Sequence, residues 1–197
     1  SVGVRTTATI MFGHVERPVH VARHLHRIRD LQRETGGFTE FVPLPFVPDE
    51  APIALKGRAR YGPTFDETVA LHATARLALD PWLPSIQTSW VKLGPEGARV
   101  MLGAGVNDLG GTLMDESISR AAGASHGQEC PPERMDAVIR AAGREPHQRT
   151  TLYGRPPADQ VRRSYGAAPL ADTTPPPYDD LGLRRPDALI RPGLTRV

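Results

Sequence analysis

The chain has 197 residues, enough for one domain with a substantial apolar core, and a formal net charge of +2. Residues 144–197 contain nine Arg against six Asp or Glu, so the slight positive excess belongs to this end of the chain. Without a concentrated basic face, such a weak excess argues against nucleic acid as a partner. No apolar run of about 18 residues and no secretory-signal pattern is present, so we expect a cytoplasmic protein without membrane contact.

Cysteine content limits the metal chemistry that this sequence can support. Cys130 is the only cysteine, which excludes an intrachain disulfide and a multi-cysteine metal site. The chain begins at Ser1 and enters a predicted strand within a few residues, so we expect it to be a piece of a longer protein.

The first predicted elements are a buried strand and an amphipathic helix. Residues 6–12 are β-branched and apolar without strict alternation, which is typical of a strand covered on both faces. Apolar positions three or four apart predict a helix over residues 18–35, and Gly36 and Gly37 offer a left-handed stop.

A second strand is predicted from residue 38. Pro43 and Pro45 cannot donate ladder hydrogen bonds, so we expect its pairing to end near Val42. The Pro- and Gly-rich residues 47–63 form a loop longer than an α/β unit needs, which indicates a substrate-facing segment.

Further alternation of helices and strands is predicted along the rest of the chain. Thr64 and Glu67 form a capping box for a helix that ends before Pro81. The remaining elements that we expect are strands at 85–92 and 106–109 and helices at 94–103, 114–122 and 133–142. Beyond Gly143, Pro and Arg dominate without sustained periodicity, so we expect a largely disordered tail.

This alternation is typical of a parallel α/β sheet, because parallel strands need a crossover helix between them. In a parallel barrel the carboxyl ends of the strands converge on one mouth, where substrates bind. Six polar residues on or after the predicted strands are therefore candidates for substrate or cofactor contacts: His14, Glu40, Gln87, Ser89, Asn107 and Asp108.

The candidates also have purely structural explanations. His14 can cap a strand or bind a carbonyl, and Asn107 and Asp108 are ordinary turn formers. Glu40 lies among apolar residues, where a carboxylate needs a partner or a raised pKa.

Four ordered blocks of the sequence resemble the C-terminal half of FO synthase, and more narrowly the part that joins tyrosine to 5-amino-6-(D-ribitylamino)uracil. They are TTATIMFGHVE at 6–16, RIRDLQRETGGFTEFVPLPFVP at 27–48, SIQTSWVKLGPEGA at 85–98 and GVNDLGGTLMDESISRAAGASHGQ at 105–128. The resemblance covers about residues 5–153.

The resemblance implies the C-terminal half of a radical S-adenosylmethionine (βα)8 barrel, about four βα units, followed by a helix and a tail. We accordingly expect a barrel half at 1–128, a C-terminal helix at 129–143 and the tail at 144–197. The family implies S-adenosylmethionine and a 4Fe-4S cluster as cofactors, the cluster being held by a C-x3-C-x2-C loop. Because this chain lacks that loop, we expect it to be inactive without the other barrel half.

Tyrosine and the ribityl-uracil are the partners that the resemblance implies, with the six candidate residues lining their site.

Two alternatives stay open. Related radical enzymes of the menaquinone futalosine route share some of these blocks, although GRARYGPTFDET at 57–68 is closer to the deazaflavin group. A non-catalytic binding module is the other alternative, and a genuine start codon at this point would support it.

Overall fold

A computed structural model describes residues 3–113, 119, 126 and 129–168 of the chain. The elements in chain order are β1 (Thr6–Phe12), α1 (Pro18–Thr35), β2 (Phe38–Pro45), α2 (Pro52–Leu55), α3 (Phe65–Leu79), α4 (Trp90–Gly103), α6 (Pro132–Ala141) and α7 (Ala158–Tyr165). The helix predicted at 114–122 and the final residues 169–197 lie outside the described part.

Strands β1 and β2 form a parallel sheet, as the alternation of elements predicts. Ala8 pairs with Phe41, and the ladder is continued by single bridges from Phe41 to Ile86 and from Gln87 to Asp108. The mixed α/β class and the parallel sheet are therefore confirmed. The described residues do not form a closed barrel.

The third and fourth predicted strands are shorter than expected. Pairing at Ile86 and Gln87 ends because α4 already begins at Trp90, and the fourth segment pairs only through Asp108. The expected helix start at Gly94 and Pro95 is found inside α4, where Gly94 has a left-handed φ of 70° that separates a first turn from the rest of the helix.

Prolines do not stop β2 where the sequence pattern predicts. Pairing with β1 continues to Phe12 and Pro45 instead of ending near Val42. The physical reason is the direction of the N–H groups: Phe41 N–H donates to Ser85, whereas Phe46 N–H donates to the Phe12 carbonyl at 2.9 Å. Along a strand, every second residue points its N–H group to the same side, so residues 43 and 45 lie on the side on which Phe41 N–H faces Ser85. The N–H groups that the two prolines lack therefore would not face β1.

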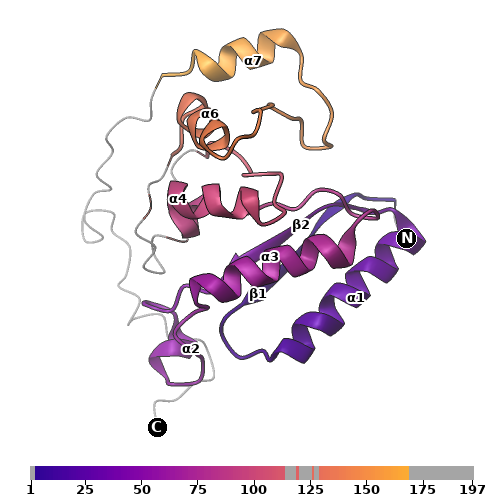
Figure 1. The fold of residues 1–197 in the computed structure, drawn as a ribbon, viewed down its shortest axis with the longest axis vertical. Helices are drawn as coiled ribbons and strands as arrows, with labels where there is room; N and C mark the ends of the chain where they lie inside the picture. Colours follow the sequence, from indigo (N-terminus) through magenta and orange to yellow (C-terminus); the bar gives the residue numbers. More distant parts are fainter. Residues whose placement is uncertain (1–2, 114–118, 120–125, 127–128, 169–197) are drawn as a thin grey trace, which may run out of the picture.

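Helices α1 and α3 pack side by side over one face of the sheet (Figure 1). Ala8, Leu25, Phe41, Ala75 and Ile86 are at most 3% exposed and form the centre of this core. The end of α1 and the start of α3 both lie where the sequence signals predict them.

Local signals explain those ends. Gly36 adopts a left-handed φ of 59° at the end of α1. Thr64 Oγ1 accepts from Glu67 N at 3.1 Å, and Glu67 Oε2 accepts from Thr64 N at 2.8 Å, which completes the expected capping box.

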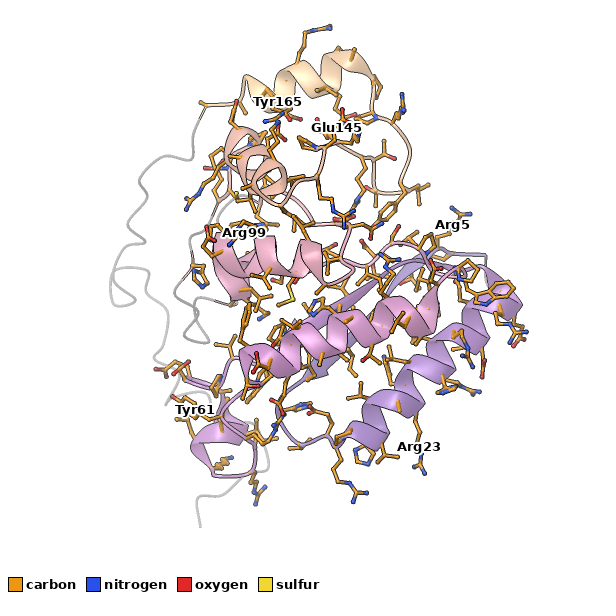
Figure 2. The ribbon with its side chains drawn as sticks, in the orientation of Figure 1. Arg5, Arg23, Tyr61, Arg99, Glu145 and Tyr165 are labelled. Carbon is orange, nitrogen blue, oxygen red and sulfur yellow. The ribbon has the colours of Figure 1, made fainter. Side chains whose placement is uncertain are left out.

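The C-terminal part of the described chain is ordered, which corrects the expectation of disorder from residue 144. α6 packs on α4, and α7 packs on α6 (Figure 1). Figure 2 shows Tyr165 of α7 beside α6, where its hydroxyl donates to Asp136 Oδ2 at 3.0 Å. The prediction failed because residues 144–168 are fixed by contacts with distant residues and not by helical periodicity of their own.

No helix in the described residues is long and apolar enough to cross a membrane.

Candidate functional site

The loop after β1 is built around a glycine that no other residue can replace without strain. Gly13 has a left-handed φ of 89°, and a Cβ at this position would lie 2.2 Å from Pro63 Cδ. This turn places the next residues, His14 to Glu16, at the carboxyl end of the strand. We call residues 13–16 the His14 loop.

Glu16 holds the His14 loop together with its carboxylate. Oε1 accepts from Gly13 N at 2.6 Å, and Oε2 accepts from His14 N at 3.0 Å and lies 2.9 Å from His14 Nδ1. Burial raises the pKa of Glu16, but the hydrogen bonds from backbone N–H groups and His14 outweigh it and lower the pKa from 4.5 to about 2. Glu16 is therefore a carboxylate at neutral pH.

The long loop between β2 and α3 is tied to the His14 loop. Arg60 N–H donates to the His14 carbonyl at 2.8 Å, and its guanidinium lies 2.8 Å from Glu67 and 3.8 Å from Glu16. The His14 ring lies against Phe46, with ring centroids 5.6 Å apart. These contacts place part of residues 47–63 beside the carboxyl end of β1, and the substrate-facing role of this loop stays a prediction.

A second group of polar side chains lies on the face of the sheet opposite the helices. Glu40 Oε1 accepts from Thr7 Oγ1 at 2.9 Å, and Glu40 Oε2 lies 2.5 Å from Tyr153 OH and 3.3 Å from Arg149 Nη2. Asp108 Oδ2 lies 2.6 Å from Tyr153 OH and also bonds Arg149 Nε. We call Glu40, Asp108, Arg149 and Tyr153 the Arg149 cluster.

The Arg149 cluster is compact and largely withdrawn from solvent. The Asp108 side chain is 5% exposed and that of Glu40 is 14% exposed, and the Arg149 guanidinium stacks 4.2 Å from the Tyr153 ring centre. Burial raises the pKa of Tyr153 far above its usual value, and the bonds to Asp108 and Glu40 raise it further. The phenol is therefore a hydrogen-bond donor under ordinary conditions, not a base.

The position of the Arg149 cluster along the strands differs from that of the His14 loop. Glu40 is the third residue of β2, and Asp108 pairs with Gln87 one step beyond the level of Ala8 and Phe41. The cluster thus lies toward the amino-terminal half of the sheet, whereas the His14 loop follows the carboxyl end of β1. In (βα)8 barrels substrates bind at the carboxyl ends of the strands, and the amino-terminal side serves stability.

Asp108 also shapes the glycine turn that follows it. Its Oδ1 accepts from Gly110 N at 2.6 Å, and Trp90 Nε1 donates to the Gly111 carbonyl at 3.0 Å. The Gln87 side chain lies directly against this turn, because a Cβ on Gly110 would come within 2.7 Å of Gln87 Nε2.

Asn107 and Ser89 lie apart from both groups. Asn107 Oδ1 accepts from Arg76 Nη2 and Ile86 N, both at 2.9 Å, so its side chain links α3 to the sheet. Ser89 precedes α4 without a side-chain capping bond, and its carbonyl accepts from the N–H groups of Lys92 and Leu93. Of the six candidates, the structure thus brings together Glu40 and Asp108, with Gln87 nearby.

Sequence reasoning missed Arg149 and Tyr153, because both fall in the segment assigned to the tail. The one signal that could have found them was the extent of the resemblance, which reaches residue 153. An open cavity of about 780 Å³ adjoins these two residues and Asp108, and it is bordered by α6, α7 and the 106–112 segment.

Metal ligands are not gathered in this part of the fold. Within residues 3–113 and 129–168 and the two isolated described positions, no three His, Cys, Asp or Glu side chains are arranged to hold a metal ion. Cys130 is 4% exposed, and burial raises the pKa of its thiol, so it is not suited to bind iron as a thiolate.

Comparison with known proteins finds one matching family model and several similar proteins. The sequence model described as "CofH/MqnC C-terminal region" matches residues 35–161. The FO synthase of Streptomyces coelicolor is 54% identical over 160 residues, which are 81% of this chain and 18% of that protein. A protein of Methanopyrus kandleri named 5-amino-6-(D-ribitylamino)uracil--L-tyrosine 4-hydroxyphenyl transferase is 53% identical over 151 residues, which are 77% of this chain and 41% of that protein.

These matches confirm the resemblance drawn from the four sequence blocks. The FO synthase of Mycobacterium tuberculosis strain H37Rv is likewise 51% identical over 152 residues, again 77% of this chain and 18% of that protein. The chain therefore spans less than half of the length of the curated relatives that it matches.

Proposed function

Because the chain belongs to the CofH/MqnC C-terminal region family, we propose that it forms part of a radical S-adenosylmethionine enzyme of FO biosynthesis. The reaction would couple a tyrosine-derived fragment to 5-amino-6-(D-ribitylamino)uracil, on the way to 7,8-didemethyl-8-hydroxy-5-deazariboflavin. One observation carries this proposal: the identity exceeds 50% with both a bacterial FO synthase and an archaeal protein named for the coupling reaction.

The architecture supports a role as one half of a barrel. The strand order β1, β2, Ile86–Gln87 and Asp108 is sequential and parallel, with α1 and α3 on one face. On the opposite face Met11 is 52% exposed, as expected for a side chain that a further layer or strand would cover. In the proposed enzyme, a segment outside this sequence completes the barrel.

The residues of this chain do not fit a 4Fe-4S cluster. A cluster needs several thiolates, and the single buried Cys130 supplies none of them. The proposal therefore places the cluster and the site of S-adenosylmethionine cleavage on the other half of the barrel. The contribution of this chain is to form the wall that binds and orients the substrates.

The six candidate residues differ in their capacity to bind a substrate. His14 Nε2, the Gln87 amide and the Ser89 hydroxyl have no hydrogen-bond partner among the described residues, so they can accept or donate bonds to a ligand. Glu40 and Asp108 already use all four carboxylate oxygens on protein groups, and Asn107 Oδ1 accepts from Arg76 and Ile86, so a substrate contact would require these oxygens to share their bonds. The proposal accordingly ranks the first three ahead of the others.

The proposed function is tested with the complete protein that contains this chain, reconstituted anaerobically with iron and sulfide. Tyrosine, the ribityl-uracil, S-adenosylmethionine and a reductant are supplied, and products are measured by mass spectrometry. We expect a tyrosine–uracil adduct that is lost when the cluster-binding cysteines are replaced by alanine. Absence of the adduct, together with formation of a futalosine-type product from its own substrates, would favour the alternative enzyme. No product from either substrate set would favour a binding module.

A further inference from the structure

The His14 loop fixes one histidine with more bonds than a simple turn requires. Gly13 is pressed against Pro63, the Arg60 N–H binds the His14 carbonyl, and the Glu16 carboxylate accepts three hydrogen bonds within the loop. The His14 ring also lies against Phe46, so its plane is held from a second side. Both the backbone and the ring of His14 are thus restrained.

The contact with Glu16 decides which ring nitrogen of His14 carries the proton. Glu16 is ionised and its oxygens can only accept, so Nδ1 at 2.9 Å from Oε2 must be the donor. In the neutral imidazole, Nε2 is then an acceptor with a free lone pair. The His14 side chain is 23% exposed, and no described residue binds Nε2. A ligand at the carboxyl end of the sheet can therefore reach this nitrogen.

From this geometry we infer that His14 accepts a hydrogen bond from a substrate amine through Nε2, and that Glu16 is the positioning residue that fixes the required tautomer. The inference rests on the proposed function, since both substrates named for the archaeal relative carry amine N–H groups: the α-amino group of tyrosine and the 5-amino and 6-ribitylamino groups of the uracil. An imidazole acceptor backed by a carboxylate is complementary to such N–H donors. The inference adds Glu16 to the site and gives His14 a defined role.

The experiment uses the complete enzyme, first shown to form the adduct, so that failure of the proposed function is seen before any variant is measured. His14→Phe removes both ring nitrogens. His14→Gln places an amide oxygen near the former Nε2. Glu16→Gln leaves a neutral amide that no longer obliges Nδ1 to be the donor. Val19→Thr is the matched control, because Val19 lies outside the His14 loop in the first turn of α1 and is 41% exposed.

KM for each substrate and kcat are measured separately, together with the 15N NMR signals of His14 in the ligand-free protein. We expect His14→Phe to raise KM for one of the two substrates about tenfold or more, with His14→Gln restoring part of the loss. The substrate whose KM changes identifies which of the two molecules donates the hydrogen bond to His14. Glu16→Gln should raise the same KM and shift the 15N pattern toward the Nε2-protonated tautomer, whereas Val19→Thr should change neither.

Two results would overturn the role of His14. One is a His14→Phe enzyme whose KM values and kcat stay within about twofold of the wild type. The other is a wild-type 15N spectrum in which Nε2, not Nδ1, carries the proton of neutral His14. If Glu16→Gln lowers activity while the tautomer stays unchanged, the positioning role of Glu16 is likewise rejected.

Discussion

The His14 loop and the Arg149 cluster are both polar groups on one parallel sheet, yet they use their hydrogen bonds differently. In the Arg149 cluster all four carboxylate oxygens of Glu40 and Asp108 already bind protein donors. In the His14 loop one ring nitrogen remains available. The comparison teaches that burial and charge alone do not mark a binding site. Under the proposed function, unused hydrogen-bonding capacity at the carboxyl end of the strands is the property expected of a binding site, in contrast to a network that holds the fold together.

The largest expected effect comes from Asp108, which anchors the Arg149 cluster. Asp108→Asn removes the carboxylate that bonds Arg149 Nε, leaves Glu40 as the remaining carboxylate partner of Arg149 among the described residues, and should lower the free energy of unfolding of the complete protein by about 4 kcal/mol. Denaturant unfolding measures this loss. Asp159→Asn is the control, because Asp159 also pairs with an arginine at 2.6 Å but is 53% exposed. Its expected cost is below about 1 kcal/mol. Equal costs for the two variants would show that the cluster is not a stabilising network.

Glu16 should make stability depend on pH in the acid range. Its pKa is lowered in the folded protein from 4.5 to about 2, so its stabilising contribution is complete above pH 4.5 and disappears as the pH falls through 2. The difference corresponds to about 3 kcal/mol. The free energy of unfolding measured from pH 5 to pH 2 should fall more steeply for the wild type than for Glu16→Gln. Parallel curves for the two proteins would contradict the bonding seen in the His14 loop.

A smaller effect is expected from Tyr153, which joins Glu40 and Asp108 through one hydroxyl. Tyr153→Phe removes the single hydroxyl proton that the two carboxylates share and should cost about 2 kcal/mol, since this bond involves a charged group. Thermal unfolding of the complete protein measures the change. Tyr165→Phe serves as the control because its hydroxyl binds only Asp136 among the described residues, at 3.0 Å and near the surface. If Tyr165→Phe destabilises the protein as much as Tyr153→Phe, the Tyr153 hydroxyl contributes no more to stability than a hydroxyl near the surface.

The smallest effect lies outside both regions, at the start of α3. Thr64→Ala removes the side-chain cap that accepts from Glu67 N and should cost about 1 kcal/mol. A cost similar to that of Asp108→Asn would mean that local capping matters as much as the long-range network. The same unfolding experiment measures it.

The parts of the fold that depend on neighbouring residues could be predicted from the sequence. The α1 stop at Gly36 and the capping box of Thr64 and Glu67 were predicted correctly because both signals act within a few residues. The lengths of the third and fourth strands could not be predicted, since they depend on where α4 begins and on which partner is available. The continuation of β2 through Pro45 depended on the direction of N–H groups within a sheet that the sequence does not specify.

The candidate site shows the same division. His14 was found because it follows a strand, and the loop that holds it is local. Arg149 and Tyr153 were missed because their partner Glu40 lies 109 and 113 positions away in the chain. No periodicity or motif reports a contact over such a separation. Substrate contacts by the six candidate residues remain predictions.

The most direct test of the distinction between the two regions is the coupling rate per folded molecule of two variants of the complete enzyme. The account predicts that His14→Phe folds normally but loses activity at a fixed substrate concentration below KM. It also predicts that Tyr153→Phe is less stable, while its folded molecules couple tyrosine to the uracil at a rate near that of the wild type. A His14→Phe enzyme with full activity, or a stable Tyr153→Phe enzyme without activity, would contradict the account.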